Sequence, residues 1–327
     1  MTANAAGAVW LTGADGFVGG WLRRELAERG RQAAALVLEP ARLGGVLPAI
    51  RLDLAEAARA APGQAVIDLE ALPPPSGLIH LAALSHPSEC AADPPRARAV
   101  NTVGPARLYE QILDRWPDLP ILHVSSGQVY LPASAPRRED EPVEPVNVYG
   151  ASKLQGEAVA LGLRDRGHRI TVVRPFNHTG PGQDPRFALP SFALRIAALE
   201  RRGGGELKVG RLDAVRDFLH VRQVAAVYLE LLARAGEVDV VNVCSGRGRA
   251  IGDLLDGLVT RSQAAIQVVP DPARLRGAAD PGVLVGDPGR LRSLLGRVPE
   301  LDEDALLDEL LADARVRVEA GEDLTRA

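Results

Sequence analysis

Residues 11–19 of the chain read Leu-Thr-Gly-Ala-Asp-Gly-Phe-Val-Gly, with a glycine at every third position from Gly13 onward. An apolar run, residues 8–11, precedes this stretch, and a helical pattern, residues 17–29, follows it. In such a turn one glycine allows the tight bend, another lets a pyrophosphate approach the backbone, and the third lets helix and strand pack closely. The free N–H groups at the helix start then bind phosphate, so the pattern predicts a dinucleotide-binding turn. The residues of the turn that we expect at the cofactor are Gly13, Asp15, Gly16, Phe17 and Val18.

The end of the second apolar run, residues 33–38, bears on which dinucleotide is bound. A carboxylate there would hold the ribose 2′-hydroxyl of NAD, whereas a basic side chain would accept the 2′-phosphate of NADP. Glu39 stands one or two residues later than the usual place for that carboxylate, and Arg42 follows it. The sequence therefore favours NADP slightly over NAD. Asp53 and Leu54 follow the third apolar run, where they meet the adenine, or Asp53 instead caps a helix.

The remainder of the first half alternates short apolar runs with helical stretches, a pattern typical of a parallel α/β sheet. The predicted strands are residues 8–11, 33–38, 49–52, 77–81, 121–125 and 169–173, and the predicted helices are residues 17–29, 96–115 and 149–166. After residue 175 the chain becomes rich in Gly and Pro, and a later strand, residues 238–243, is expected to return to the sheet. We predict a doubly wound Rossmann sheet with a smaller, discontinuous α/β substrate domain. The expected bounds are 1–175 for the dinucleotide-binding domain, with 215–245 returning to it, and 176–214 with 246–327 for the substrate domain.

Tyr149 and Lys153 stand four residues apart near the start of a predicted helix, hence on one helix face. An ammonium beside a phenol lowers a tyrosine pKa of about 10 toward the working pH and makes the tyrosine a general acid or base. Ser126 ends the preceding strand, at the edge where open α/β sheets place ligands. Among 38 basic side chains of Lys and Arg, only Lys153 and Lys208 are lysines. The sequence thus predicts a catalytic group of Ser126, Tyr149 and Lys153, while Lys208 has no assigned chemistry.

Further short motifs accompany these residues. The segments are Thr12-Gly13-x-x-Gly16-Phe17-x-Gly19, Asp53-Leu54, His80-Leu81-Ala82-Ala83, Asn101-Thr102-Val103-Gly104, Ser125-Ser126-x-x-Val129-Tyr130, Tyr149-x-x-x-Lys153 and Arg174-Pro175. These motifs, and the order in which they occur, resemble those of the extended short-chain dehydrogenases/reductases of the NAD-dependent epimerase/dehydratase family. The resemblance implies an NAD(P)-dependent oxidoreductase in which Tyr149 is the acid/base, Ser126 the catalytic hydroxyl, and Lys153 the partner that also holds the nicotinamide ribose. The additional cofactor contacts that it implies are Leu81, Ala82, Ala83 and Asn101.

The second half is similar to the GDP-4-keto-6-deoxymannose reductases of that family. The matching segments are residues 174–183, 189–192, 209–218, 242–246 and 271–276. The substrate contacts expected from this similarity and from charge are Ser85, Ser126, Gln128, Asn177, Leu189, Arg216, Arg249 and Arg276. Gln128 stands where dehydratases of the family have an acidic residue, and because an amide takes up no proton at neutral pH, it argues against elimination. Arg211 and His220 depart from the group's usual Asn and acidic residue, so the particular sugar is left open.

We therefore expect a reductase that transfers hydride from NAD(P)H to C4 of a nucleotide-activated 4-keto-6-deoxyhexose. The alternative is an NAD-dependent sugar-nucleotide 4-epimerase, which would use the same residues and return the hydride to the same sugar. A non-catalytic dinucleotide-sensing protein is a third reading, but such proteins usually lose the tyrosine or the lysine, and both are present here.

Composition limits the partners. A formal net charge of −4 argues against a nucleic-acid surface, and the two cysteines, Cys90 and Cys244, match neither a disulfide framework nor a metal site. No apolar stretch approaches the roughly 18 residues of a membrane helix. We expect a cytoplasmic protein without a metal, binding a nucleoside-diphosphate sugar but neither nucleic acid nor membrane. We also expect a homodimer, because extended members of the family pair through the helix bearing Tyr149 and Lys153 and the helix before it.

Overall fold

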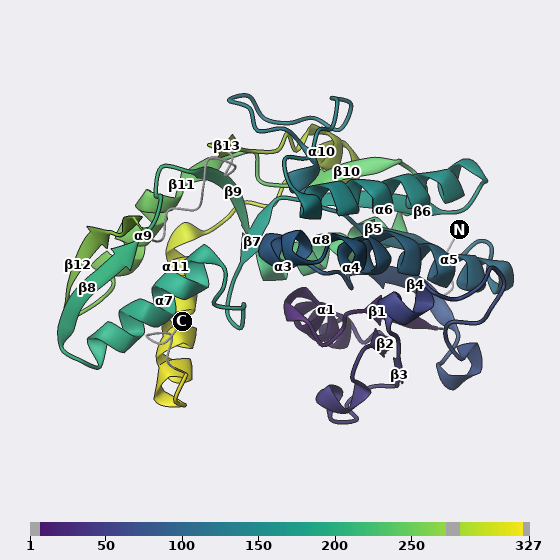
Figure 1. Ribbon diagram of the computed structural model, residues 1–327, viewed down its shortest axis with the longest axis horizontal. Coiled ribbons are helices and arrows are strands. Elements are labelled where there is room, and N and C mark those ends of the chain that lie inside the picture. Colours follow the sequence, from purple (N-terminus) through teal and green to yellow (C-terminus); the bar gives the residue numbers. More distant parts are fainter. Residues whose placement is uncertain (1–6, 273–281, 323–327) are drawn as a thin grey trace.

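The structure, a computed structural model, describes residues 7–272 and 282–322. Its main sheet has seven parallel strands in the order β10-β6-β5-β4-β1-β2-β3 (Figure 1). Their bounds are β1 Ala8–Thr12, β2 Ala33–Val37, β3 Ala49–Arg51, β4 Pro75–His80, β5 Ile121–Val124, β6 Ile170–Pro175 and β10 Val240–Val243. Each lies close to a predicted strand. The chain moves outward from β1 to β3 and then restarts at β4 on the other side of β1, the reversal that defines a doubly wound sheet. The predicted fold class is confirmed.

Strand β1 shows why the sheet is apolar throughout. Val9 and Leu11 enter the core on one face, while Ala8 and Trp10 enter the core on the other, and all four are fully buried. Helices cover both faces, so successive side chains are buried instead of alternate ones. The first face carries α1 (Phe17–Glu28), α8 (Val221–Ala233) and α10 (Gly289–Leu295). The second face carries α2 (Leu54–Ala57), α5 (Gly104–Arg115) and α6 (Val148–Asp165). Two short helices pack against α6, namely α3 (Pro87–Ala92) and α4 (Pro94–Arg98).

The single helix predicted for residues 96–115 is interrupted by a π-helical turn, Ala99–Val103, between α4 and α5. Pro105 has no N–H, so it cannot make the ordinary helical hydrogen bond to the carbonyl of Asn101. The same carbonyl faces α6, since a Cβ on Gly156 would come within 2.5 Å of it. Such turns occur frequently at functional sites, and this one lies beside the helix that carries Tyr149.

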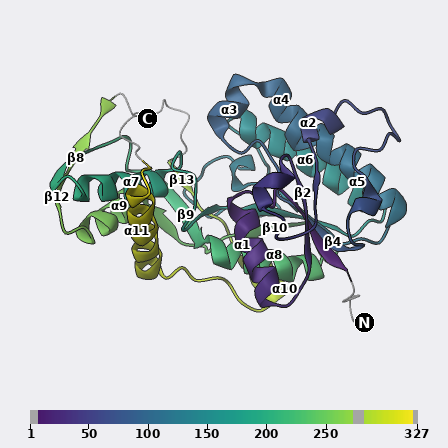
Figure 2. The same ribbon diagram turned by 90° about the horizontal axis from the view of Figure 1, so that it is seen from below.

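A second part of the molecule lies beside the main sheet (Figure 1, Figure 2). It has an apolar core of its own, built on three helices. These are α7 (Ala188–Glu200), α9 (Ile251–Thr260) and α11 (Glu303–Glu319), and α11 packs against α7. A four-stranded sheet contains β7 (Asn177–Thr179), β9 (Val215–His220), β11 (Gly248–Ala250) and β13 (Val283–Leu284), and a two-stranded sheet contains β8 (Gly204–Val209) and β12 (Ala265–Pro270).

The segment expected to return to the first domain, residues 215–245, divides between the two parts. Helix α8 and strand β10 lie at the main sheet, whereas β9 pairs with β7, β11 and β13 in the smaller sheet. We keep the division into two domains as a proposal, with the return beginning at α8. Within the described ranges, no helix combines the length and the apolar character needed to cross a bilayer.

Candidate active site

A cavity of about 1290 Å³ opens at the carboxyl ends of the parallel strands. One wall comes from the glycine turn and the ends of β2, β4 and β5, and the opposite wall from α7 and the loop before it. Ligand pockets commonly measure roughly 300–1,000 Å³. The cavity therefore has room for two ligands side by side, as a dinucleotide and its substrate require.

The glycine turn forms a cradle in the wall of this cavity. Gly13 has φ +64°, in the left-handed region that favours glycine, and a Cβ there would come within 3.1 Å of the Ala82 backbone. Helix α1 begins after Gly16, which has no side chain to cap the first turn. Gly16, Phe17 and Val18 line the cavity, so the N–H groups of this helix start, which lack a side-chain cap, are available to an anion there.

Replacing Gly19 by alanine is expected to damage both the fold and the cradle. A Cβ would come within 2.3 Å of the Gly13 carbonyl oxygen and 2.7 Å of the Ala14 Cα, and neither backbone atom can swing aside. We expect the free energy of unfolding in urea to fall by about 1–3 kcal/mol. Gly20→Ala in the same helix is the control, because its Cβ would meet only the Arg23 guanidinium, at 4.0 Å. Equal stability of the two variants would contradict this account.

Tyr149 lies in the first turn of α6, half-buried in the cavity wall. The Asn147 side chain caps this helix by accepting a hydrogen bond from the Gly150 N–H at 2.8 Å. Burial raises the pKa of Tyr149 to about 12, and a hydrogen bond with Ser126 lowers it only in part. The lowering of this pKa that the sequence predicts from Lys153 is not seen, because burial is the largest cause of the shift and raises the pKa. At neutral pH the phenol therefore holds its proton and is a donor.

Lys153 lies one turn further along α6 and is only 2% exposed. Burial lowers the pKa of its ammonium to about 8, although the Glu157 carboxylate acts in the opposite direction. Ser126 is also buried; its hydroxyl accepts a hydrogen bond from the Gln128 N–H at 3.1 Å and so caps a short 3₁₀ turn, Gly127–Val129. All three predicted catalytic residues line the same cavity.

A buried ion pair stands next to these residues, and the sequence reasoning missed it. Arg174 on β6 donates two hydrogen bonds to the Glu157 carboxylate, at 2.9 and 2.7 Å, and Ser125 donates a third at 2.5 Å. Arg174 also donates to the Tyr130 hydroxyl at 2.8 Å, which in turn donates to Asn242 at 2.8 Å. The sequence signals for this pair were the Arg174-Pro175 motif and the four-residue spacing from Lys153 to Glu157. This chain of bonds fixes the segments next to the predicted catalytic residues, namely the end of β5 and the third turn of α6.

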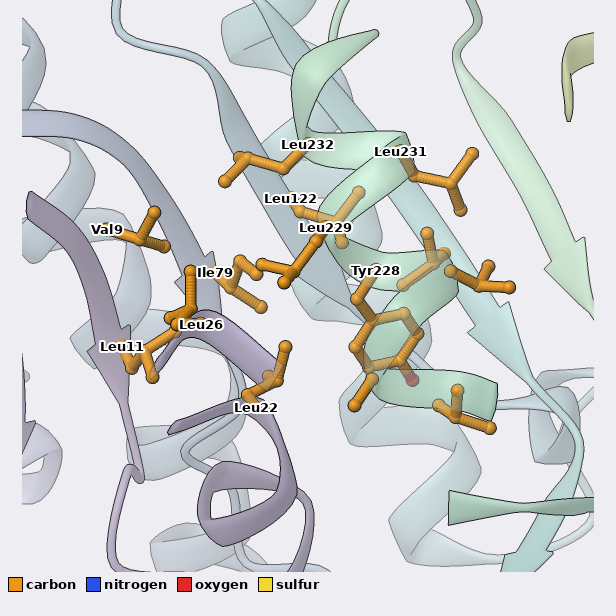
Figure 3. Packing of buried hydrophobic residues seen from close by; sticks show 14 of the residues in the cluster. Val9, Leu11, Leu22, Leu26, Ile79, Leu122, Tyr228, Leu229, Leu231 and Leu232 are labelled. Carbon is orange, nitrogen blue, oxygen red and sulfur yellow. The ribbon is translucent and has the colours of Figure 1, made fainter. Parts of the chain in front are cut away.

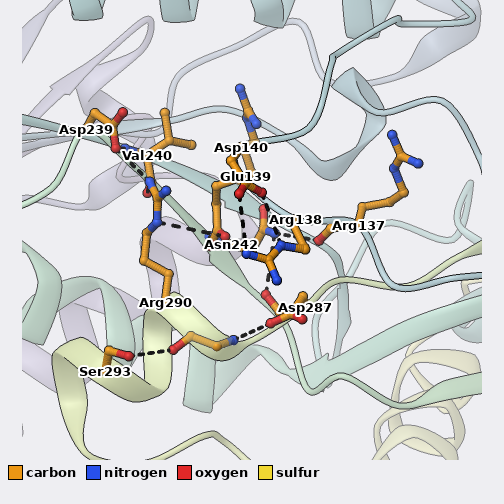
Figure 4. A network of polar contacts seen from close by, with 12 residues as sticks. Arg137, Arg138, Glu139, Asp140, Asp239, Val240, Asn242, Asp287, Arg290 and Ser293 are labelled. Atoms are coloured by element: carbon orange, nitrogen blue, oxygen red, sulfur yellow. Dashed lines mark hydrogen bonds and ion pairs between the residues drawn. The ribbon is translucent and has the colours of Figure 1, made fainter.

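Asn242 on β10, the last residue in this series of hydrogen bonds, also binds the long loop that precedes α6 (Figure 4). The Asn242 amide donates to the Arg137 carbonyl at 2.9 Å, and its backbone N–H donates to Glu139 at 2.8 Å. Arg290 on α10 pairs with Asp239 at 2.7 Å beside it. Because the loop leads into α6, these contacts set the position from which the helix with Tyr149 and Lys153 starts.

The structure places nearly all expected cofactor residues in the cavity wall. Those that line it are Gly13, Asp15, Gly16, Phe17, Val18, Arg42, Asp53, Leu54, Leu81, Ala82, Ala83, Tyr149 and Lys153. Asp53 does so while also capping α2, since it accepts the N–H groups of Ala55 and Glu56. Asn101 does not line the cavity, which corrects the expectation. It is buried, with its amide bonded to the backbone of Leu84 and to Ser152, and it supports the wall from behind.

The expected substrate residues are only partly brought together. Ser85, Ser126, Gln128, Asn177, Leu189 and Arg216 line the cavity. Arg249 does not; its guanidinium pairs with Glu303 at 2.7 Å, so the expectation for this residue is wrong. Arg276 lies outside the described residues.

Several residues of the wall were not expected from the sequence, among them His86, Arg186, Phe187, Arg195 and Tyr228. Arg186 pairs with Glu89 of α3 across the cavity mouth, and the rings of His86 and Phe187 stand 5.8 Å apart there. These pairs join the two parts of the molecule only in three dimensions, so no local pattern could have found them. In the two described stretches, His, Cys, Asp and Glu side chains form no group able to hold a metal ion.

Comparison with known proteins agrees with this geometry. Residues 9–244 match the NAD dependent epimerase/dehydratase family. A GDP-6-deoxy-D-mannose reductase of Pseudomonas aeruginosa is 34% identical over 323 residues, which cover 95% of this chain and 98% of that protein. A GDP-6-deoxy-D-talose 4-dehydrogenase of Aggregatibacter actinomycetemcomitans is 30% identical over 68% of this chain and 74% of its own length.

Solved structures give the same result. The structure of RMD from Pseudomonas aeruginosa complexed with NADPH has a TM-score of 0.79 and 32% identity, covering 95% of this chain and 99% of that one. MoeE5 in complex with UDP-glucose and NAD also has a TM-score of 0.79, with 25% identity, covering 95% of this chain and all of that one. The chain belongs to the NAD dependent epimerase/dehydratase family. It is an NAD(P)-dependent oxidoreductase of the extended short-chain dehydrogenase/reductase type.

Proposed function

We propose that the protein is a reductase acting at C4 of a nucleotide-activated 4-keto-6-deoxyhexose, with GDP-4-keto-6-deoxymannose as the first candidate substrate. The observation that carries this proposal is Tyr149, a phenol that keeps its proton at neutral pH and faces the cavity beside Ser126. A carbonyl reduction needs such a donor, because the oxygen of the carbonyl must gain a proton as its carbon gains hydride. The similar Pseudomonas aeruginosa reductase supports the choice of substrate.

The cradle at Gly13 and the helix start at Gly16 fit a dinucleotide pyrophosphate, and Lys153 and Tyr149 stand at the other end to hold its nicotinamide ribose. The reduced dinucleotide, when bound, supplies the hydride. Ser126 hydrogen-bonds the substrate carbonyl oxygen, and Tyr149 donates its proton to that oxygen as the alkoxide develops. Lys153 keeps a positive charge next to the phenolate that this step leaves behind.

Gln128 distinguishes this chemistry from a dehydration. Its side-chain oxygen accepts a hydrogen bond from the Asn147 amide at 3.0 Å, which leaves its NH₂ group to donate toward the cavity that it lines. An amide can hold a sugar hydroxyl but cannot remove a proton from a sugar carbon at neutral pH. We propose that Gln128 positions the sugar.

The direct test is NAD(P)H consumption by the purified protein with GDP-4-keto-6-deoxymannose and with its TDP counterpart. We expect oxidation of the cofactor with stoichiometric formation of a 6-deoxyhexose nucleotide. No turnover with any 4-keto sugar nucleotide would overturn the proposal.

A 4-epimerase is the second candidate, favoured by relatives such as a UDP-glucose 4-epimerase of Azospirillum brasilense, 31% identical over 56% of this chain. An epimerase regenerates its own cofactor, so it would arrive from purification with tightly bound NAD and act without added dinucleotide. A dependence on added NAD(P)H would exclude it.

We propose NADPH as the preferred cofactor. Leu38, half exposed, lines the cavity directly after β2, close to where a carboxylate would hold the 2′-hydroxyl of NAD. Arg42 also lines the cavity and donates two hydrogen bonds of 2.9 Å to Glu39 on the protein surface. The solved NADPH complex of the similar Pseudomonas aeruginosa protein supports this preference.

Changing Arg42 to alanine is expected to raise KM for NADPH about tenfold and to leave KM for NADH unchanged. A charge-assisted hydrogen bond contributes about 1.5 kcal/mol at an exposed site, which corresponds to this factor. Glu39→Gln is the opposite change, because it frees Arg42 for the 2′-phosphate, and it is expected to lower KM for NADPH. Steady-state kinetics with both cofactors measure the effect; equal changes for NADH and NADPH would contradict it.

The turnover number for reduction is expected to be constant below neutrality and to fall as pH rises through about 8. The pKa of Lys153 is about 8, so its ammonium is charged below this pH and lost above it, while the pKa of Tyr149 is about 12, so its phenol keeps its proton throughout. The pH profile of Lys153→Arg is the control, because a guanidinium stays charged and the falling limb should vanish even if the rate is lower. An unchanged limb in that variant would assign it to another group.

We also propose a cytoplasmic homodimer that pairs through α5 and α6. Ala158 and Gly162 are exposed on α6, and small residues at this spacing allow a second helix to approach closely. Light scattering in solution tests the oligomeric state.

A further inference from the structure

Tyr228 of α8 is a buried tyrosine whose hydroxyl has no hydrogen-bond partner in residues 7–272 and 282–322. The residue is 0% exposed, and its hydroxyl is one of five buried side-chain atoms without a hydrogen bond among the described residues. The others belong to Arg107, His123, Arg137 and Glu141, none of which lines the cavity, whereas Tyr228 does. A buried hydroxyl is normally hydrogen-bonded, because leaving it unpaired is costly. The unpaired hydroxyl of Tyr228 therefore lies where a ligand is expected to bind.

The packing around Tyr228 gives no reason for a hydroxyl (Figure 3). It belongs to the apolar cluster between α1, α8 and the sheet, and the other fully buried members of that cluster are Val, Leu, Ala and Ile. A phenylalanine would fill the same volume among them. The oxygen is the one part of the side chain that this cluster does not explain.

The direction of the side chain brings its oxygen to the cavity. Helix α8 leads back to the parallel strand β10, so it runs antiparallel to the strands and its first turn lies at their carboxyl edge. Long side chains on a helix point toward its N-terminus, and Tyr228 lies two turns into α8. It thus reaches the sheet edge from the face opposite α6.

Tyr228 and Tyr149 approach the same end of the cavity from opposite faces of the sheet. Burial raises the pKa of Tyr228 well above its ordinary value. Tyr228 consequently remains a neutral hydrogen-bond donor at every working pH. Val124 and Pro175, at the ends of β5 and β6, line the cavity at this end as well.

We propose that Tyr228 is a cofactor-binding residue whose hydroxyl donates a hydrogen bond to the carboxamide oxygen of the nicotinamide. This inference rests on the proposed dinucleotide site and adds to it a residue outside the glycine turn and the Ser, Tyr, Lys group. The carboxamide is the hydrogen-bonding group that the nicotinamide ring itself carries, and a donor held in a rigid apolar cluster fixes the rotation of that ring. Tyr228 would thereby determine which face of the ring is turned to the substrate carbonyl.

The test measures binding, not turnover. Dissociation constants of wild type and Tyr228→Phe are determined by calorimetry for NADPH and for 2′-phospho-ADP-ribose, which lacks the nicotinamide. We expect the variant to bind NADPH about three- to tenfold more weakly, the factor of one neutral hydrogen bond. Its affinity for 2′-phospho-ADP-ribose should be unchanged. Its urea midpoint without ligand should not fall, because none of the residues that the structure describes bonds to this hydroxyl.

Tyr109→Phe is the matched control. Tyr109 is equally buried but its hydroxyl is hydrogen-bonded to His123 at 2.8 Å and it does not line the cavity. This variant should lose stability and keep both affinities. If Tyr228→Phe weakens both probes alike, or neither, the assignment of Tyr228 is wrong and the dinucleotide site stands. If wild type itself binds neither probe, the dinucleotide site is wrong and the assignment fails with it.

Discussion

The turnover number of Tyr149→Phe is expected to be about 10²–10⁴-fold lower than that of the wild type, the range that a positioned general acid contributes. Phenylalanine keeps the aromatic ring in the cavity wall and removes the hydroxyl, which is the group that transfers the proton. Because the pKa of this phenol is about 12, its hydroxyl is protonated at every working pH. Water would have to protonate the developing alkoxide in its place, because the proposed role of Ser126 is to hold the carbonyl oxygen and not to supply this proton.

Two measurements make this result specific. NADPH should bind to Tyr149→Phe within a fewfold of its wild-type affinity, since the glycine cradle and Lys153 are retained, and the urea midpoint should stay close to that of the wild type. Tyr109→Phe, a buried tyrosine outside the cavity, should keep its turnover. Loss of less than tenfold in Tyr149→Phe would assign the proton to another donor. Intact cellular function of this variant would favour a dinucleotide-sensing protein over an enzyme.

The features that were predictable from the sequence depend on short spacings. The three glycines have a fixed spacing within one loop, at Gly13, Gly16 and Gly19. Tyr149 and Lys153 have a fixed spacing on one helix, so the geometry of each set follows once the loop or the helix forms. The parallel strands were equally predictable, because burial on both faces leaves continuous apolar runs such as residues 8–11. In these cases local structure determines the site.

The features that were not predictable depend on contacts between distant segments. Arg249 was expected at the substrate because of its charge, but its guanidinium forms an ion pair with Glu303. Which of the 36 arginines face the cavity is determined by the fold and not by the local sequence. The pKa of Tyr149 rises where its spacing from Lys153 predicts a fall, since spacing says nothing of burial. Tyr228 fits the apolar period of α8 as an ordinary core residue, and only the position of α8 against the sheet edge brings its hydroxyl to the cavity.

The buried pair of Glu157 and Arg174 leads to the second large effect. Glu157→Gln is expected to lower the free energy of unfolding by about 3–5 kcal/mol, because it leaves the Arg174 guanidinium buried without a counter-charge. The side chains are only 1% and 6% exposed, so water cannot replace the lost carboxylate. Turnover should fall as well, since Ser125 loses a charged acceptor at 2.5 Å and stands next to Ser126. Urea denaturation and steady-state kinetics measure the two effects.

Glu25→Gln is the control for charge removal, because Glu25 pairs with Arg29 on the surface of α1, where such a pair contributes at most about 1 kcal/mol. The double variant Glu157→Leu/Arg174→Met separates stability from positioning. Replacing a buried ion pair by apolar side chains is often neutral for stability, so this variant should fold almost as well as the wild type. Its turnover should still be reduced, because no charge then holds Ser125 and the third turn of α6 in place. Full recovery of both stability and turnover would show that the pair only fills space, whereas recovery of stability alone identifies it as the support on which Ser126 and Lys153 are positioned.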